Sequence, residues 1–231
     1  MPKLKDSIIR LSPSTTNLFL ECKKCFWLAQ VQEIHRPRGI FPSLPSGMDN
    51  LIKKYFDNYR IQGTLPPEIE GKVDGVLMAD LELLNKWRSW RTGLVYHDPA
   101  ISAQLSGALD DLLVNPQKHV YMPFDYKTRG FALKDDSTSY YQNQLNCYGL
   151  MLEKNGMKAA DHGYLCYYIP TNVGEHGVVT FEVTVKKMNI DPSAAQKVFE
   201  DAVALIKGPM PKAHSTCIYC IWGNEFVNDQ Y

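Results

Sequence analysis

The sequence has no excess of either charge, because 25 lysine and arginine residues are matched by 25 aspartate and glutamate residues. Domains that bind nucleic acid usually carry a net positive charge or a clear basic face. The even balance therefore counts mildly against a nucleic-acid partner. Any such partner would have to be held by a local basic surface and by bound cations.

Long apolar runs are missing as well. No segment approaches the roughly 18 to 20 apolar residues that cross a bilayer, and residues 1–10 lack the apolar core of a signal peptide. Internal repeats and low-complexity segments are also absent from the sequence. We therefore expect a cytoplasmic protein with no membrane association.

The chain does contain the material for a large core. It has 231 residues, of which 45% are hydrophobic and 11% aromatic, and this is enough to bury the interior of one elaborated domain. We predict a single domain over residues 1–231. Its expected class is α/β, with a mixed central sheet flanked by helices.

Hydrophobic periodicity and turn residues predict the elements of this domain. A turn at residues 115–118 joins two strands into a hairpin with an acidic residue on each arm, which we place at the middle of the sheet. The last predicted helix ends at Gly208-Pro209. The predicted helices are 15–32, 48–60, 140–154 and 192–207, and the predicted strands are 73–77, 103–114, 120–127, 163–169 and 178–185.

Two carboxylates and one lysine lie on the arms of that hairpin. Asp110 follows Gly107 on the first arm, and Asp125 and Lys127 lie two residues apart on the second. Side chains alternate along a strand, so residues 125 and 127 share a face. Such oxygens suit a hard cation that polarises a phosphodiester, while an ammonium group orients the attacking water. The alternative is that these are ordinary strand-end acids and a solvated lysine.

Several segments in a fixed order carry a family resemblance. They are Leu105-Ser-Gly-Ala-Leu-Asp110, Phe124-Asp-Tyr-Lys-Thr128 and Gln144-Leu-Asn-Cys-Tyr148, with Ser12-Pro-Ser14 preceding Cys22. Together they resemble the motifs of the PD-(D/E)XK nuclease superfamily, particularly its RecB-like branch, which includes the CRISPR-adaptation (Cas-type) iron-sulfur nucleases. Each motif is short, but their order along the whole chain is specific.

This resemblance implies a Mg²⁺- or Mn²⁺-dependent DNA nuclease that acts on single strands or on DNA ends, as an exonuclease does. By the resemblance, Asp110 and Asp125 would be metal ligands, the carbonyl of Tyr126 would be a backbone ligand, and Lys127 would be the catalytic lysine. The implied partner is DNA, and protein partners are not identified by the sequence.

Three further residues of the implied active site lie on predicted helices. Gln144 and Tyr148 would border the site and contact DNA, although a helix-surface glutamine and a buried tyrosine are the plainer interpretation. They are one helical turn apart on one face. Many members of the branch carry a metal-ligating histidine in a Gly-x-x-x-His motif, but no histidine follows Gly47 at this spacing. Asp49 is our substitute ligand, although an acid in a first helical turn also stabilises the helix by itself.

Two cysteine pairs of the form C-x-x-C lie at opposite ends of the chain. Cys22 pairs with Cys25, and Cys217 pairs with Cys220. Each pair presents two thiolates from one tight turn, so together they can complete a tetrahedral sulfur site for zinc or an iron-sulfur cluster. Disulfides are not expected in a reducing compartment. We expect this site to join the two ends of the fold.

Related nucleases hold a 4Fe-4S cluster with one cysteine near the N-terminus and three near the C-terminus. Cys22 matches the first of these, and Cys217 and Cys220 match two of the others. The final cysteine of the family pattern is absent, so Cys25 would replace it. By analogy we favour a 4Fe-4S cluster, with Zn²⁺ as the alternative because two C-x-x-C pairs are equally the pattern of structural zinc.

Two other functions fit parts of the sequence. One is a catalytically inactive module that binds DNA or a protein, which the missing histidine supports. The other is a zinc-clamped structural protein, which fits the neutral charge. The segment Trp87-Arg88-Ser89-Trp90-Arg91 alternates aromatic and basic residues as base-stacking surfaces do, but we prefer a helix that is half core and half solvated. Lys53 and Lys54 are predicted to lie on a solvated face.

Overall fold

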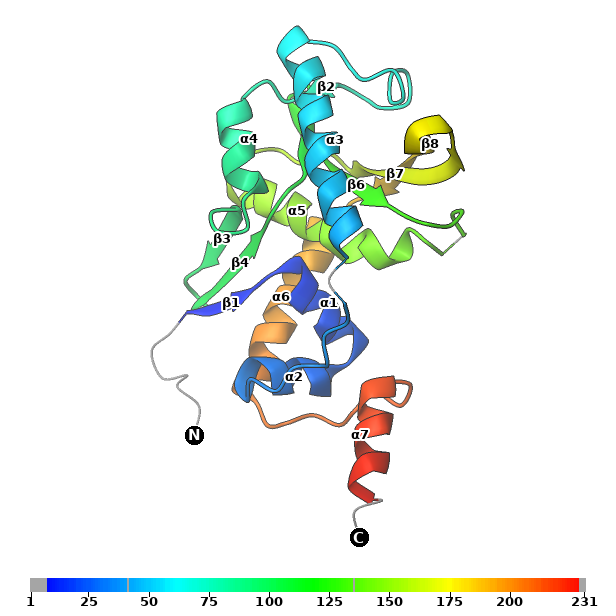
Figure 1. Cartoon of the computed structure of the whole chain (residues 1–231). Helices are drawn as coiled ribbons and strands as arrows, with labels where there is room; N and C mark the ends of the chain where they lie inside the picture. Colours follow the sequence, from blue (N-terminus) through cyan, green and yellow to red (C-terminus); the bar gives the residue numbers. More distant parts are fainter. Residues whose placement is uncertain (1–7, 41, 135, 229–231) are drawn as a thin grey trace.

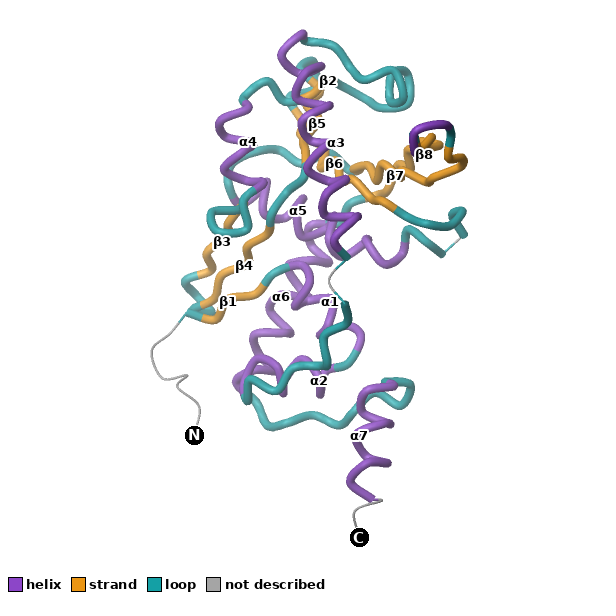
Figure 2. The backbone as a smooth tube through the Cα atoms, viewed as in Figure 1, coloured by secondary structure: helices purple, strands orange, loops and turns teal. Residues whose placement is uncertain are grey.

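The computed structural model describes residues 8–40, 42–134 and 136–228. These residues form two β-sheets with helices packed around them (Figure 1). The helices and strands are interleaved along the chain (Figure 2). The mixed α/β class predicted from the sequence is therefore confirmed. No described helix is both long enough and apolar enough to cross a membrane.

The larger sheet has five strands in the order β2-β5-β6-β7-β8. Its strands are β2 (Val76–Leu77), β5 (Asp111–Asn115), β6 (Val120–Thr128), β7 (His162–Val173) and β8 (Val179–Asn189). The β5 and β6 strands form the predicted antiparallel hairpin, whereas β6 and β7 run parallel. The middle strand of the sheet is β6, so the Asp-x-Lys segment lies at its centre.

The smaller sheet has three strands in the order β1-β4-β3, namely β1 (Ile9–Leu11), β4 (Ala103–Gly107) and β3 (Leu94–Asp98). The prediction of one strand over 103–114 was therefore wrong, because the chain leaves this sheet after Gly107 and enters the larger one at Asp111. The backbone groups at the break find partners elsewhere. Leu109 N donates to the carbonyl of Trp87, and the Tyr148 hydroxyl donates to the carbonyl of Ala108.

Two helices replace the single helix predicted over 15–32. They are α1 (Pro13–Glu21) and α2 (Lys23–Val31), separated by Cys22 in an extended conformation with φ −159° and ψ 106°. The first begins with a capping box in which Ser12 and Thr15 exchange hydrogen bonds. The break turns the chain so that Cys22 and Cys25 face the same point.

The other helices follow the sequence patterns with shifted ends. They are α3 (Ser43–Gln62), α4 (Leu81–Arg88), α5 (Gln142–Lys154), α6 (Pro192–Lys207) and α7 (Ile218–Asn228). The third helix begins five residues before the predicted start at residue 48, and residues 139–141 form a short 3₁₀ turn ahead of α5. Helix α7 was not predicted. It lies beside α2 at one end of the molecule (Figure 1).

The core is divided by the larger sheet. On one face, Phe56 of α3 packs against Tyr126 with ring centroids 4.8 Å apart, and Phe124 joins this cluster. The opposite face of β6 carries Asp125, whose carboxylate contacts Gln144 of α5. Alternation along β6 therefore puts aromatic side chains under α3 and the acidic and basic side chains toward α5.

Candidate functional site

The residues predicted to form the active site line one cavity of about 390 Å³, which we call the acidic cavity. It lies where the break before β5, the end of β6, the start of α3 and the start of α5 meet. The predicted site residues in its wall are Asp49, Asp110, Asp125, Tyr126, Lys127, Gln144 and Tyr148. Their roles remain predictions, but the fold brings all of them together.

Asp125 and Lys127 form an ion pair on one face of β6. The Asp125 side chain is 1% exposed, and that of Lys127 is 17% exposed. Burial raises the pKa of Asp125 to about 7, with Lys127 opposing the rise and Asp110 adding to it. Burial alone would lower the pKa of Lys127, but the neighbouring carboxylates outweigh it and raise the value. The pair is therefore strongly coupled and shielded from solvent.

Asp110 is held by contacts to both its backbone and its side chain. The backbone N–H of Tyr126 donates to Asp110 Oδ2 at 3.2 Å, and Arg88 Nε donates to the Asp110 carbonyl at 2.8 Å. Lys53 Nζ lies 2.8 Å from Asp110 Oδ1. The carboxylate is thus fixed at the edge of the hairpin, facing the cavity that also holds Asp125.

Lys53 is the residue that the sequence interpretation missed. Its ammonium group also lies 2.7 Å from Asp49 Oδ2, and its side chain is only 16% exposed. The prediction of a solvated Lys53 was therefore wrong, because two carboxylates draw the ammonium group inward. The spacing of four residues from Asp49 to Lys53 was the available signal, since it places both side chains on one helix face.

Gln144 joins the acidic cavity to helix α5. Its amide Nε2 donates to Asp125 Oδ1 at 3.1 Å and to the Tyr148 hydroxyl at 2.8 Å. Its Oε1 accepts a longer hydrogen bond of 3.4 Å from Lys127 Nζ. Gln144 and Tyr148 share one face of the helix, as their spacing predicted, and the Tyr148 ring is buried. Gln144 thus contacts both members of the Asp125–Lys127 pair.

A buried ionic network lies beneath Asp110. Asp111 is fully buried, and both of its oxygens lie 2.6 Å from Arg60 Nη2. Arg88 and the Tyr126 hydroxyl also donate to Asp111, at 3.1 and 2.6 Å. Asp57 accepts from both arginines. The network connects α3, α4, β5 and β6, and so fixes the backbone from which Asp110 projects.

The donor set of the acidic cavity is chemically suited to a hard divalent cation. Asp49, Asp110 and Asp125 supply carboxylate oxygens, which Mg²⁺ and Mn²⁺ prefer. Two lysine ammonium groups stand among these carboxylates and offset part of their charge. A cation that binds all three carboxylates would therefore compete with Lys53 for Asp49 and Asp110.

The four cysteines of the C-x-x-C pairs meet in one cluster, as predicted. The Sγ of Cys25 lies 3.6 Å from that of Cys217 and 3.5 Å from that of Cys220, and the Sγ atoms of Cys22 and Cys220 are 3.8 Å apart. All four sulfur atoms lie within 4.8 Å of one another. The cluster joins the α1–α2 segment to α7, so the two ends of the chain are brought together.

The surroundings of this cluster act on its thiols in opposite directions. Burial alone would raise the pKa of Cys22, but backbone N–H donors at His214 and Cys25 outweigh it and lower the value to about 6. Burial raises the pKa of Cys25 and of Cys220. A bound cation would overcome that rise, because metal ligation requires deprotonated cysteine.

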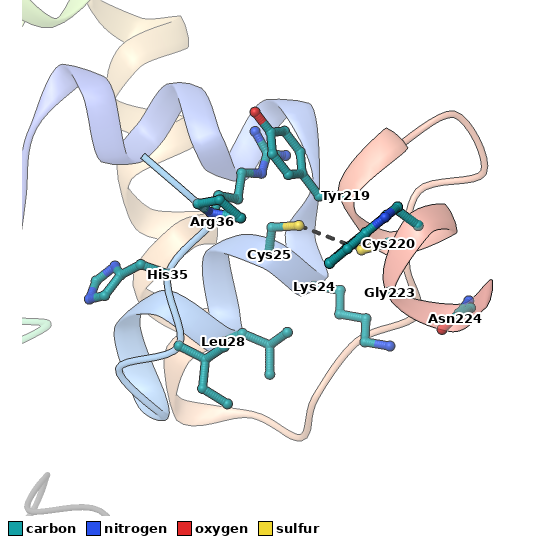
Figure 3. A pocket seen from close by; sticks show the side chains of 12 residues that line it. Lys24, Cys25, Leu28, His35, Arg36, Tyr219, Cys220, Gly223 and Asn224 are labelled. Carbon is teal, nitrogen blue, oxygen red and sulfur yellow. Dashed lines mark hydrogen bonds between the residues drawn. The ribbon is translucent and has the colours of Figure 1, made fainter. Parts of the chain in front are cut away.

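Arg36 is a second residue that the sequence interpretation missed. Its Nη2 lies 3.7 Å from Cys217 Sγ, its Nη1 pairs with Glu21 at 2.6 Å, and its guanidinium lies 4.5 Å from the ring centroid of Tyr219. It borders a cavity of about 460 Å³ that reaches Cys25 and Cys220 (Figure 3). Its positive charge would offset part of the negative charge of thiolates in the cluster.

A family model described as the PD-(D/E)XK nuclease superfamily matches residues 48–224. This range contains every predicted residue of the acidic cavity and the C-terminal cysteine pair, whereas Cys22 and Cys25 precede it. No curated protein matches the chain.

Proposed function

Because this chain belongs to the PD-(D/E)XK nuclease superfamily, we propose that it is a Mg²⁺- or Mn²⁺-dependent deoxyribonuclease acting on single-stranded DNA or DNA ends. One observation carries the proposal: Asp110, Asp125 and Lys127 lie on one cavity, with the lysine paired to the buried aspartate. The cavity supplies oxygen ligands and a cation at the same place, and hydrolysis of a phosphodiester needs both.

The proposed roles follow from the contacts. Asp110 and Asp125, with the Tyr126 carbonyl, would hold the divalent cation, which would supply Lewis-acid chemistry at the phosphoryl oxygen and activate a water. The Lys127 ammonium group orients the attacking water and offsets the negative charge that develops on the phosphoryl oxygens. Gln144 fixes the relative position of Asp125 and Lys127 through its hydrogen bonds to both.

Asp49 is the proposed replacement for the family histidine. The residue at the histidine spacing after Gly47 is Leu51, whose side chain is 61% exposed. Asp49 instead lines the acidic cavity, and its carboxylate shares the Lys53 ammonium group with Asp110. A carboxylate is an adequate oxygen ligand for Mg²⁺ or Mn²⁺. The loss of the histidine is therefore compatible with activity.

The cysteine site is proposed to hold a single tetrahedral ion, with Zn²⁺ preferred. A zinc–sulfur bond of about 2.3 Å sets the edge of a ZnS₄ tetrahedron at about 3.8 Å. Three of the six sulfur separations are 3.5, 3.6 and 3.8 Å, and all six are within 4.8 Å. In a 4Fe-4S cluster each thiolate binds a different iron, which places the sulfurs farther apart. The 4Fe-4S cluster, which the sequence favoured by analogy, therefore becomes the alternative to Zn²⁺. The clamp supports the proposal that the chain folds as one domain.

The nuclease proposal is tested by incubating labelled single- and double-stranded DNA with the purified protein in Mg²⁺, Mn²⁺ or EDTA. The expected result is cleavage that requires the cation, favours single strands or ends, and is lost in the Asp125→Ala variant. No cleavage by a folded protein that still binds DNA would favour the catalytically inactive module, which is the second candidate because the family histidine is missing.

The metal proposal has its own test. Elemental analysis of protein purified both with and without oxygen is expected to find one zinc per chain and a colourless solution. Four iron and four sulfide per chain, with a brown colour that fades in air, would instead establish the iron-sulfur cluster.

A further inference from the structure

A second cavity of about 390 Å³ adjoins the acidic cavity, and we call it the Trp90 cavity. The two cavities share Ala108, Gln144 and Tyr148 in their walls. The shared wall includes Gln144, which also contacts Asp125. A nucleotide strand that leaves the acidic cavity on this side therefore enters the Trp90 cavity next.

Trp90 stands apart from the core. Its side chain is 80% exposed, whereas that of Trp87 is 6% exposed and packs into the main core. The exposed ring is nevertheless held on an ordered turn, because Thr92 N and Gly93 N both donate to the Ser89 carbonyl. The Arg91 guanidinium lies 5.0 Å from the centroid of the Trp90 ring. The result is a flat aromatic face with an adjacent positive charge at the mouth of a cavity.

The rest of the Trp90 cavity is uncharged and carries several polar side chains. Ser12, Ser14 and Asn17 of the α1 segment line it, together with Gly107. Its described lining contains no carboxylate, in contrast to the acidic cavity. A phosphate needs a bound cation to enter the acidic cavity, but a neutral, flat group with hydrogen-bonding edges fits the Trp90 cavity as it stands.

We propose that the Trp90 cavity receives the nucleotide adjoining the scissile phosphate, with its base stacked on Trp90. This inference rests on the proposed nuclease function and specifies the substrate of that site. Within a duplex, each base is paired and stacked on both faces, so its face is not available to the indole ring. Only an unpaired base can stack there, and the substrate is therefore a single strand or a frayed end.

The two halves of the Trp-Arg-Ser-Trp-Arg segment serve different sides of the fold. Trp87 and Arg88 face inward, where Arg88 supports Asp110 and Asp111. Trp90 and Arg91 face outward at the cavity. One short segment thus positions a proposed metal ligand with its first half and offers a base-stacking surface with its second half.

The test measures binding separately from cleavage. Fluorescein-labelled oligothymidylate and a hairpin duplex of equal length, both with phosphorothioate linkages that resist cleavage, are titrated with wild-type, Trp90→Leu and Trp90→Phe proteins in Mg²⁺, with fluorescence anisotropy as the readout. Leucine keeps an apolar side chain but removes the aromatic face, and phenylalanine keeps an aromatic face. Circular dichroism checks folding, which the exposed position should leave unchanged.

The expected result is that Trp90→Leu weakens binding of the single strand about 5- to 150-fold, the range for losing one stacked base. Trp90→Phe should lose much less, and duplex binding should not change. An oligothymidylate with one abasic position should abolish the difference between wild type and Trp90→Leu when that position is the stacked one.

Each contrary result identifies what has failed. Equal single-strand binding by wild type and Trp90→Leu, with cation-dependent cleavage intact, would overturn the Trp90 inference and leave the nuclease standing. Equal losses of single-strand and duplex binding would also overturn it. A wild-type protein that neither binds nor cleaves DNA would overturn the proposed function, and this inference with it.

Discussion

Lys53 and Asp110 form an ion pair of 2.8 Å beside the acidic cavity, and the same ammonium group reaches Asp49 at 2.7 Å. The lysine therefore stands between two proposed metal ligands. It comes from the helix of Asp49, whereas Asp110 comes from the break between the two sheets. This contact links Asp49, the proposed replacement for the family histidine, to the proposed metal ligand Asp110.

Removing this ammonium group should strengthen cation binding. In Lys53→Met, Asp49 and Asp110 lose their competing partner, so we expect Mn²⁺ to bind about tenfold more tightly, which corresponds to about 1.4 kcal/mol. Isothermal titration calorimetry measures the affinity directly. Lys54→Met is the matched control, because it removes the same charge from an exposed neighbouring position. Equal or weaker binding in Lys53→Met would show that the lysine does not compete with the cation.

The buried network beneath Asp110 should be costly to open. In Arg60→Met, the fully buried Asp111 loses its closest cationic partner and keeps Arg88. We expect the free energy of unfolding to fall by about 3 kcal/mol, as for other buried pairs that lose one member. Urea denaturation measures the change. Lys197→Met, which breaks an exposed pair with Asp201, should change stability by less than about 0.5 kcal/mol.

The same network predicts a loss of stability in acid. Burial alone would raise the pKa of Asp57, but hydrogen bonds and charge from Arg88 and Arg60 outweigh it and lower the value. A lowered pKa in the folded state adds stability that is present above the unfolded value of about 3.9 and is lost as the pH falls through the folded value.

Thermal unfolding of wild type and Asp57→Asn between pH 6 and pH 2 checks this linkage. The wild type should be the more stable protein at pH 6, and its advantage should shrink once the pH falls below about 4. An advantage that stays constant down to pH 2 would mean that the carboxylate of Asp57 does not contribute through its ionised form.

The site formed by the four clustered cysteines should contribute strongly to the stability of the whole fold. Cys217→Ser should lose the bound metal and lower the melting temperature by about 10 °C or more, because the binding free energy of a structural metal contributes to folding. Metal analysis and differential scanning calorimetry measure the two effects. Cys147→Ser is the control, since Cys147 is buried in the main core away from the cluster. Retention of full metal content by Cys217→Ser would rule out the four-sulfur site.

The sequence predicted those parts of the site that depend on local periodicity. The two-residue alternation of a strand placed Asp125 and Lys127 together, and the helical spacing placed Gln144 and Tyr148 together. The turn at residues 115–118 was sufficient to predict the hairpin. In each case the partners are close in sequence, so no knowledge of the tertiary fold was required.

The features that the sequence did not predict depend on distant contacts. In the sequence, the segment across the break after Gly107 has the pattern of one continuous strand. The groups that stabilise the break, the Trp87 carbonyl and the Tyr148 hydroxyl, come from distant parts of the chain. The sequence around Lys53 is that of a surface lysine, and only the folded chain brings Asp110 next to it. Local pattern cannot distinguish such residues from solvated ones, since the contact that buries them is made only in the folded chain.

We propose that the acidic cavity hydrolyses DNA with Lys127 as a participant, and single-turnover cleavage of labelled single-stranded DNA is the decisive measurement. Wild-type protein should cleave in Mg²⁺ or Mn²⁺ but not in EDTA. Lys127→Met should cleave about 100- to 1,000-fold more slowly, the usual cost of removing one group that stabilises transition-state charge, while it still folds, as circular dichroism would show. Cleavage by Lys127→Met at the wild-type rate, or by the wild type in EDTA, would contradict the account.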